Sequence, residues 1–167
     1  MSKLTALALS IAVLGGVWAF LALGPLAGYV LVWAGFIAWG CYFALGADTT
    51  ALQKTIVGMI YGAVIAGVAL ALVGANPLGL AGPAGPAIYI AVTVFLLVIV
   101  ANVPLLSTVP ANVYGYAATA AYALQTANAS APTAMNMGNP VLLVVVSAIL
   151  GAIFGMLSGK LAGMLGK

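Results

Sequence analysis

The sequence predicts an all-α membrane protein in which six transmembrane helices form two inverted three-helix repeats. Three observations lead to this fold class. Hydrophobic residues make up 66% of the 167 residues and charged residues only 3%, whereas a soluble domain carries about 25% charged residues. Long apolar runs recur along the chain, and parts of its first half match parts of its second half. The chain has too few polar groups to cover a surface that faces water.

Six apolar segments come close to the length of about 20 residues that a membrane-spanning helix needs. Linkers rich in Gly, Pro and Asn separate several of them. No linker is long enough to divide the chain, so we expect residues 1–167 to form a single transmembrane domain. The expected helices are Leu4–Leu23, Tyr29–Leu45, Ala51–Val73, Ala87–Val103, Pro110–Leu124 and Pro140–Leu165.

The lysines indicate how these helices are oriented. With six crossings, Lys3, Lys54, Lys160 and Lys167 all fall on one side of the membrane. Short loops that carry lysine face the cytoplasm, so both termini are predicted to be cytoplasmic. Five crossings would move Lys160 and Lys167 to the other side, and the charge pattern therefore favours six.

Matching stretches in the two halves indicate an internal duplication. Ile56–Gly62 (IVGMIYG) matches Ile149–Gly155 (ILGAIFG), and Ile11-Ala12-Val13 matches Ile90-Ala91-Val92. The first repeat covers about residues 4–73 and the second about residues 87–165. Because each repeat contains an odd number of helices, the two copies enter the membrane from opposite sides. This arrangement is common in transporters and channels, whose sites lie between the halves.

The stretch Asn102–Tyr116 (NVPLLSTVPANVYGY) places prolines and polar side chains between two apolar helices. Its prolines disfavour a continuous helix. One alternative is a tight turn with Pro110 at the first helical position, and the other is a re-entrant segment beside a polar cavity. Buried amides need partners, which a water-filled pore supplies. The residues expected to line a polar path are Asn102, Ser107, Thr108 and Asn112, opposed by Tyr29 and Trp33 of the corresponding stretch Leu23–Phe36.

Glycines indicate where helices pack closely. Gly58 and Gly62 form one Gly-x-x-x-Gly pattern, and Gly151 and Gly155 form a second. Such patterns allow helix backbones to approach one another. We expect the third and sixth helices to form a tight pair, within one subunit or between subunits.

Ionisable side chains are missing from the middle of every expected helix. Proton relays and carriers of charged solutes usually place such groups inside the membrane. The sequence has no cluster of metal-ligating residues and no base that could activate a serine. We therefore expect no enzymatic activity, no metal and no cofactor. The net charge of +3 is too small to indicate a nucleic-acid partner.

Two motifs carry a resemblance to known proteins. VWAGFIAWGCYF (Val32–Phe43) and NVPLLSTVPANVYGYAAT (Asn102–Thr119), together with the glycine-patterned last helix, resemble the small bacterial inner-membrane protein family of unknown function that includes YcdZ. The resemblance implies a multi-pass protein of the bacterial inner membrane and no settled activity. The stretch around Pro104 and Pro110 is also faintly similar to the Leu-Pro-x-x-Thr-x-Pro-Phe repeats of urea transporters.

Three functions remain open at this point. The first is a passive channel for a small neutral polar solute of the urea, short-amide or ammonia class, because hydroxyls, amides and backbone carbonyls suffice to line such a pore. The second is a membrane scaffold or accessory subunit without transport activity. The third is a Na⁺-coupled carrier of a small solute. For the channel we expect contact with the lipid bilayer and a homo-oligomer, with a trimer favoured over a dimer.

Overall fold

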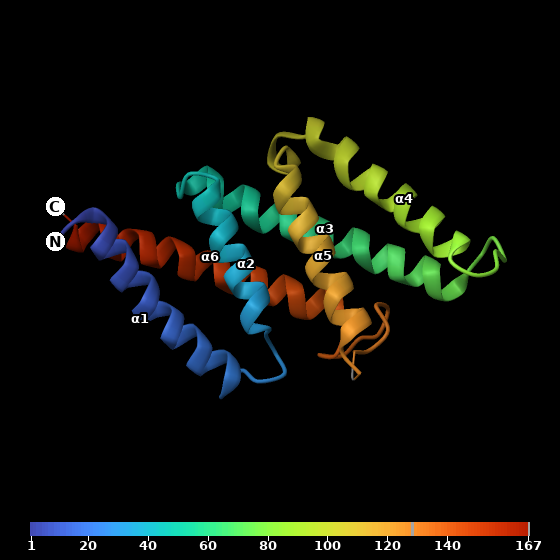
Figure 1. Cartoon of the computed structure of the whole chain (residues 1–167), viewed down its shortest axis with the longest axis horizontal. Coiled ribbons are helices and arrows are strands. Elements are labelled where there is room, and N and C mark those ends of the chain that lie inside the picture. The colour runs from blue at the N-terminus through green and yellow to red at the C-terminus, as the bar shows by residue number, and fades with distance from the viewer. Residues whose placement is uncertain (128, 167) are drawn as a thin grey trace.

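The structure is a computed structural model that describes residues 1–127 and 129–166. Asn128 and Lys167 lie outside the described residues, so the structure does not test the lysine at the C-terminus. The described residues form α-helices joined by turns, with two short 3₁₀ segments between α4 and α5 (Figure 1). The elements are α1 (Lys3–Leu23), α2 (Val32–Ala44), α3 (Thr49–Ala75), α4 (Ala84–Ile99), η1 (Val100–Asn102), η2 (Pro104–Leu106), α5 (Val109–Gln125) and α6 (Pro140–Leu165).

Four of these helices are long and apolar enough to cross a membrane. They are α1, α3, α6 and the continuous stretch of α4 and η1. The helix α2 is apolar but has only 13 residues, and α5 has 17. The structure therefore supports an all-helical, multi-pass membrane protein, which is the predicted class.

Polar side chains at the helix ends fix where several helices begin. The Asp48 carboxylate accepts a hydrogen bond from the Ala51 amide at 2.6 Å and caps α3. The Asn139 side chain accepts one from the Val141 amide at 2.8 Å, and Pro140 occupies the first turn of α6. Proline suits this position because its missing N–H would have no partner within the helix.

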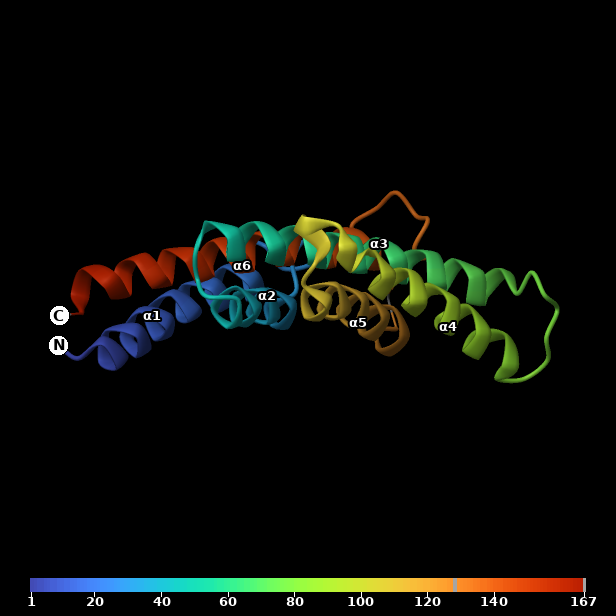
Figure 2. The same ribbon diagram turned by 90° about the horizontal axis from the view of Figure 1, so that it is seen from above.

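The helices form two layers. Figure 2 shows α3 and α6 in one layer and α2 and α5 in the other, with α1 and α4 at opposite ends of the molecule. The closest packing is between α3 and α5 and between α2 and α6, while α1 lies on α6 and α4 lies on α3. The N-terminus and the end of α6 lie side by side in both views.

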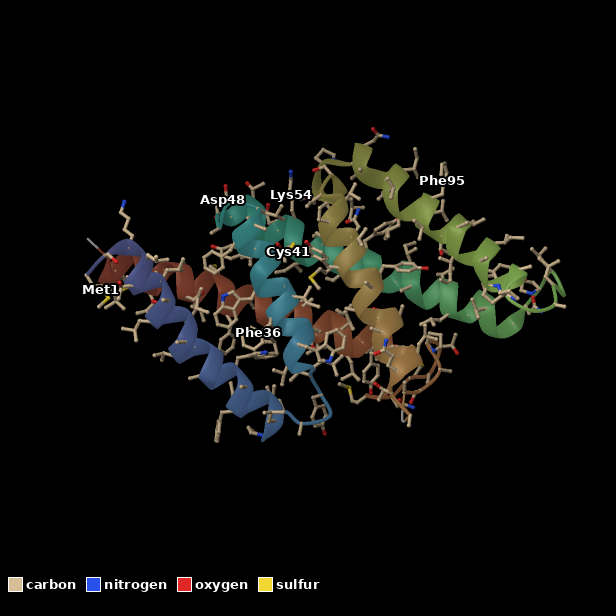
Figure 3. All side chains as sticks on the ribbon, in the orientation of Figure 1. Met1, Phe36, Cys41, Asp48, Lys54 and Phe95 are labelled. Atoms are coloured by element: carbon tan, nitrogen blue, oxygen red, sulfur yellow. The ribbon has the colours of Figure 1, made fainter. Side chains whose placement is uncertain are left out.

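Small residues fill the interior where the layers meet. One buried cluster contains Ala38, Ala148 and Ala152, and a second contains Ala63 and Ala118. Alanine leaves room for helix backbones to approach, which is the main source of packing contacts in a membrane. Many large apolar side chains point outward, as Phe95 does on α4 (Figure 3), where 64% of its surface is exposed. This distribution suits a protein whose solvent is lipid.

Candidate functional site

The connection between α4 and α5 is a compact turn. Val103 is extended, with φ −84° and ψ 125°, because the following proline disfavours the helical conformation. The Val103 amide donates to the Val100 carbonyl at 2.8 Å, and the Leu106 amide donates to the Val103 carbonyl at 2.9 Å. Of the two alternatives for this stretch, the structure builds the turn, with Pro110 in the first turn of α5.

Asn112 lies immediately after this turn and is fully buried. Its Nδ2 donates to the Leu106 carbonyl at 3.1 Å and to the Leu97 carbonyl at 3.3 Å. The Leu106 carbonyl is four residues before Pro110, which has no N–H to donate to it. The Asn112 amide gives this carbonyl, which lies before the start of α5, a donor, and it also ties α5 to the end of α4.

The Oδ1 atom of Asn112 has no hydrogen-bond partner although it is buried. It faces α3 at Gly58, where an added Cβ atom would lie 2.9 Å from it. Leaving a buried acceptor without a partner costs about 1–3 kcal/mol. Native proteins rarely keep such a group, and a ligand or water is one reason for it to persist. Asn112 is therefore the described residue best placed to accept a hydrogen bond from a solute.

The other residues expected to line a path lie on the surface of the subunit. Asn102 and Ser107 are exposed in the turn, and Thr108 is half-buried. Tyr29, in the connection between α1 and α2, is 55% exposed, and Trp33, in the first turn of α2, is 40% exposed. In Figure 1 the α1–α2 connection lies at the lower end of α2, whereas the α4–α5 turn lies at the upper end of α5, so the two are far apart. The structure thus brings Asn112 alone of the six into the interior.

The connection between α1 and α2 is stabilised by side chains from other elements. The Leu31 amide donates to Ser147 Oγ on α6 at 2.8 Å, and Trp18 Nε1 on α1 donates to the Val32 carbonyl at 3.0 Å. Gly28 has φ +83°, a conformation that glycine adopts without strain. Neither Ser147 nor Trp18 was expected to hold this connection, although a serine within an apolar helix is a signal that could have pointed to the first.

The four predicted glycines lie at helix crossings, but their partners differ from the expected α3–α6 pair. A Cβ atom on Gly62 would overlap the Asn112 carbonyl oxygen of α5. One on Gly151 would overlap the Gly35 backbone of α2, and one on Gly155 would lie 3.0 Å from the Tyr42 ring. Gly58 likewise faces α5. The structure does pack α3 against α6, where a Cβ atom on Gly67 would lie 2.7 Å from Val141 Cγ2. The four glycines face other helices because a glycine pattern marks a smooth face without specifying which helix covers it. A pairing of these faces between subunits stays a prediction.

Pockets open at several places on the described part of the chain. One has a volume of about 620 Å³ and lies between α1, α6 and the α2–α3 connection. Two others have volumes of about 490 Å³ and 330 Å³. None of these three is lined by the six residues expected to line a path, so Asn112 Oδ1 is closed off in this conformation.

The length and apolar composition of the helices define an all-helical, multi-pass membrane protein. The chain belongs to the DUF1097 family, a protein family of unknown function, whose profile matches residues 8–163. This membership confirms the expectation of a family without an assigned activity. No curated protein and no solved structure is similar enough to this chain to count as a match.

Proposed function

We propose that this protein is a passive channel for a small neutral polar solute that carries N–H groups, of the urea, short-amide or ammonia class. The observation that carries the proposal is the buried, unpartnered Oδ1 of Asn112. An N–H group of a passing solute would satisfy this acceptor at the crossing of α3 and α5. Because the acceptor is closed off here, conduction requires the α4–α5 turn to move away from α3.

The chemistry of the interior supports a neutral solute. The buried polar residues among those described are serine, threonine and asparagine. Lys3, Asp48 and Lys160 line a pocket beside the termini rather than the helix crossings. Moving a charged solute through an apolar interior without compensating charges is costly, whereas amides and hydroxyls can replace the hydration of a neutral one.

We further propose that the chain crosses the membrane six times as two inverted repeats, with cytoplasmic termini in the bacterial inner membrane. The packing partners support the repeat, because α3 pairs with α5 as α6 pairs with α2, and α4 lies on α3 as α1 lies on α6. Reporter fusions after Gly79 and Ala131 should then report the outer side, and fusions after Thr49 and Lys167 the cytoplasm. A C-terminal fusion that reports the outer side would contradict an even number of membrane crossings.

The exposed faces of α2 and α5 support a homo-oligomer. Trp33, Phe36 and Ile37 of α2 and Val113 and Tyr114 of α5 are all at least 36% exposed. A helix of 13 residues is about 20 Å long, shorter than the hydrocarbon core of about 30 Å. Copies of the subunit would cover this face better than lipid does, and we propose a trimer rather than a dimer. Native mass spectrometry tests this, and a monodisperse monomer would contradict it.

The main alternative is a scaffold or accessory subunit without transport activity. It is favoured by the α1–α2 connection, where the Leu31 amide and the Val32 carbonyl both have protein partners. A Na⁺-coupled carrier would need free backbone carbonyls, and the Leu106 carbonyl is already bound by Asn112. A turn whose polar groups all have protein partners needs no solute. The channel and the scaffold therefore differ only in whether Asn112 Oδ1 binds a solute.

Solute flux in liposomes separates the channel from the scaffold. Purified protein is reconstituted, and stopped-flow light scattering records uptake of urea, acetamide and glycerol, with a pH-sensitive dye for ammonia. The channel predicts flux above that of empty liposomes, lost in Asn112→Leu. The matched control is Thr119→Val, a buried residue on the same helix whose hydroxyl donates only to its own helix at Gly115. Flux equal to empty liposomes for every solute would establish the scaffold instead.

A further inference from the structure

The pocket between α1, α6 and the α2–α3 connection combines charged and apolar walls. Its volume is about 620 Å³, and three parts of the chain that are distant in sequence form it. The residues that matter here are Lys3 and Leu7 of α1, Phe43 and Asp48 beside the α2–α3 connection, and Met156 and Lys160 of α6. This pocket plays no part in the proposed channel, and a ligand bound in it would be independent of that function.

The charge of the pocket favours an anion. Lys3 and Lys160 both line it, and both are exposed. Asp48 also lines it, but its carboxylate accepts the Ala51 amide at 2.6 Å and lies at the N-terminus of α3, whose dipole offsets negative charge. The two ammonium groups are therefore the charges available to a ligand, and a phosphate group is the anion that lysine commonly binds.

The apolar wall favours a lipid over a free phosphate ion. Leu7, Phe43 and Met156 give the pocket an apolar side, which inorganic phosphate cannot use. Ammonium groups do not stay in the hydrocarbon layer, so Lys3 and Lys160 place the mouth of the pocket at the level of the lipid headgroups. Basic pockets between helices at this level bind anionic headgroups.

The wall formed by the α2–α3 connection has an unusual backbone. Ala47 has φ +57°, a left-handed conformation that is unfavourable for residues other than glycine. The Tyr42 hydroxyl donates to the Ala47 carbonyl at 2.5 Å and holds the connection in place. Backbone strain of this kind is most often kept where a binding site needs it. Opposite this wall, a Cβ atom on Gly163 would meet no atom within 4 Å, so α6 leaves the space open.

We propose that this pocket binds one anionic glycerophospholipid, with its phosphate between Lys3 and Lys160 and one acyl chain against Leu7, Phe43 and Met156. Lipid bound here would join the start of α1 to the end of α6. It would stabilise the folded subunit, because a ligand that binds only the native state raises its unfolding temperature.

The test measures the thermal stability of the full chain in nanodiscs of phosphatidylcholine with and without phosphatidylglycerol. We expect phosphatidylglycerol to raise the Tm of the native protein by about 5 °C. The double variant Lys3→Gln, Lys160→Gln should lose this shift. Lys54→Gln removes the same charge from a residue that does not line the pocket and should keep it. Native mass spectrometry should detect one retained phosphatidylglycerol, with retention reduced at least tenfold in the double variant.

A second variant keeps the test decisive if the lysine changes alter folding. Gly163→Leu places an apolar side chain in the open space and should displace the lipid while both lysines remain. An equal Tm shift with inorganic phosphate alone in phosphatidylcholine nanodiscs would overturn the lipid in favour of a free anion. Equal stability in the two lipid mixtures, or an equal loss in Lys54→Gln, would overturn the site altogether.

Discussion

The crossing of α2 with α6 and the crossing of α3 with α5 use the same packing device but different chemistry. Glycines bring the backbones together in both, at Gly35 and Gly151 in the first and at Gly62 and Gly115 in the second. A Cβ atom on Gly115 would overlap the Met59 carbonyl oxygen. Side chains cannot separate helices at these points, so each pair of backbones forms a fixed crossing.

The polar groups around the two crossings differ. At the first, Trp39 Nε1 donates to Ser158 Oγ at 3.0 Å, and Phe154 packs between Trp18 and Trp39 with ring centroids 5.5 Å and 5.9 Å away. At the second, the buried amide of Asn112 has both a bound donor and a free acceptor. The polar side chains named at the first crossing all have partners, whereas at the second Asn112 Oδ1 has none, and this difference distinguishes α5.

The largest loss of stability is expected when a side chain is placed between the crossing helix backbones. Gly62→Ala and Gly151→Ala should each lower the free energy of unfolding by about 3 kcal/mol or more, because the added Cβ atom would overlap backbone that cannot move without separating the helices. Gly16→Ala is the control, since an added Cβ there meets nothing within 4 Å. Thermal unfolding in detergent, followed by circular dichroism, measures all three. Tolerance of alanine at either crossing would show that the two backbones are not in contact there.

The next largest loss of stability distinguishes a serine that bonds to two parts of the chain from a serine that bonds only within its own helix. Ser147 and Ser10 are both buried and both donate to the carbonyl four residues earlier, at 2.6 Å and 2.7 Å. Only Ser147 also accepts the Leu31 amide. Ser147→Ala strands that amide and should cost about 1–2 kcal/mol, whereas Ser10→Ala should cost about 0.6 kcal/mol or less. Equal losses in denaturation experiments would mean that the bridge to Leu31 contributes nothing.

Apolar length and turn chemistry predicted the longest helices well. The expected Pro140–Leu165 is the observed α6, and Leu4–Leu23 differs from α1 by one residue. These helices depend on local signals, namely apolar composition, an Asn-Pro start and a cap. The expected Tyr29–Leu45 begins too early, because contacts from Trp18 and Ser147 hold the chain extended before Val32. Contacts of this kind join distant parts of the chain and have no local signal.

Contacts between distant parts of the chain also limit what the sequence can predict about the candidate site. The sequence identified Asn112 because an amide beside two prolines in an apolar region needs partners. It could not show that Nδ2 would donate to the Leu97 and Leu106 carbonyls, or that Oδ1 would face Gly58 and remain free. Asn102 has the same side chain and a similar setting in the sequence, yet it is exposed. Burial depends on the crossing of α3 with α5, which no stretch of sequence encodes alone.

Replacing the amide at the second crossing should have a smaller effect on stability than replacing Ser147. Asn112→Leu removes the donor to the Leu97 and Leu106 carbonyls, which is unfavourable, and removes the unpartnered Oδ1, which is favourable. Each term is about 1–3 kcal/mol, so the net change in unfolding free energy should stay below about 1 kcal/mol. Thermal unfolding of this variant belongs beside its flux measurement. A loss of several kcal/mol would mean that Asn112 serves the fold, and lost flux would then carry no information about a pore.

The smallest effect is expected at Asn102, which tests whether burial or residue type decides the role of an asparagine in this region. Its Nδ2 donates to the Ile99 carbonyl at 3.3 Å from an exposed position, so water can replace the bond when the side chain is removed. Asn102→Ala should change stability by no more than about 0.5 kcal/mol and should leave solute flux unchanged. If flux falls while stability is retained, Asn102 lies on the path and the turn opens toward it. If stability falls, the turn depends on this amide as α5 depends on Asn112, and the contrast between the two asparagines disappears.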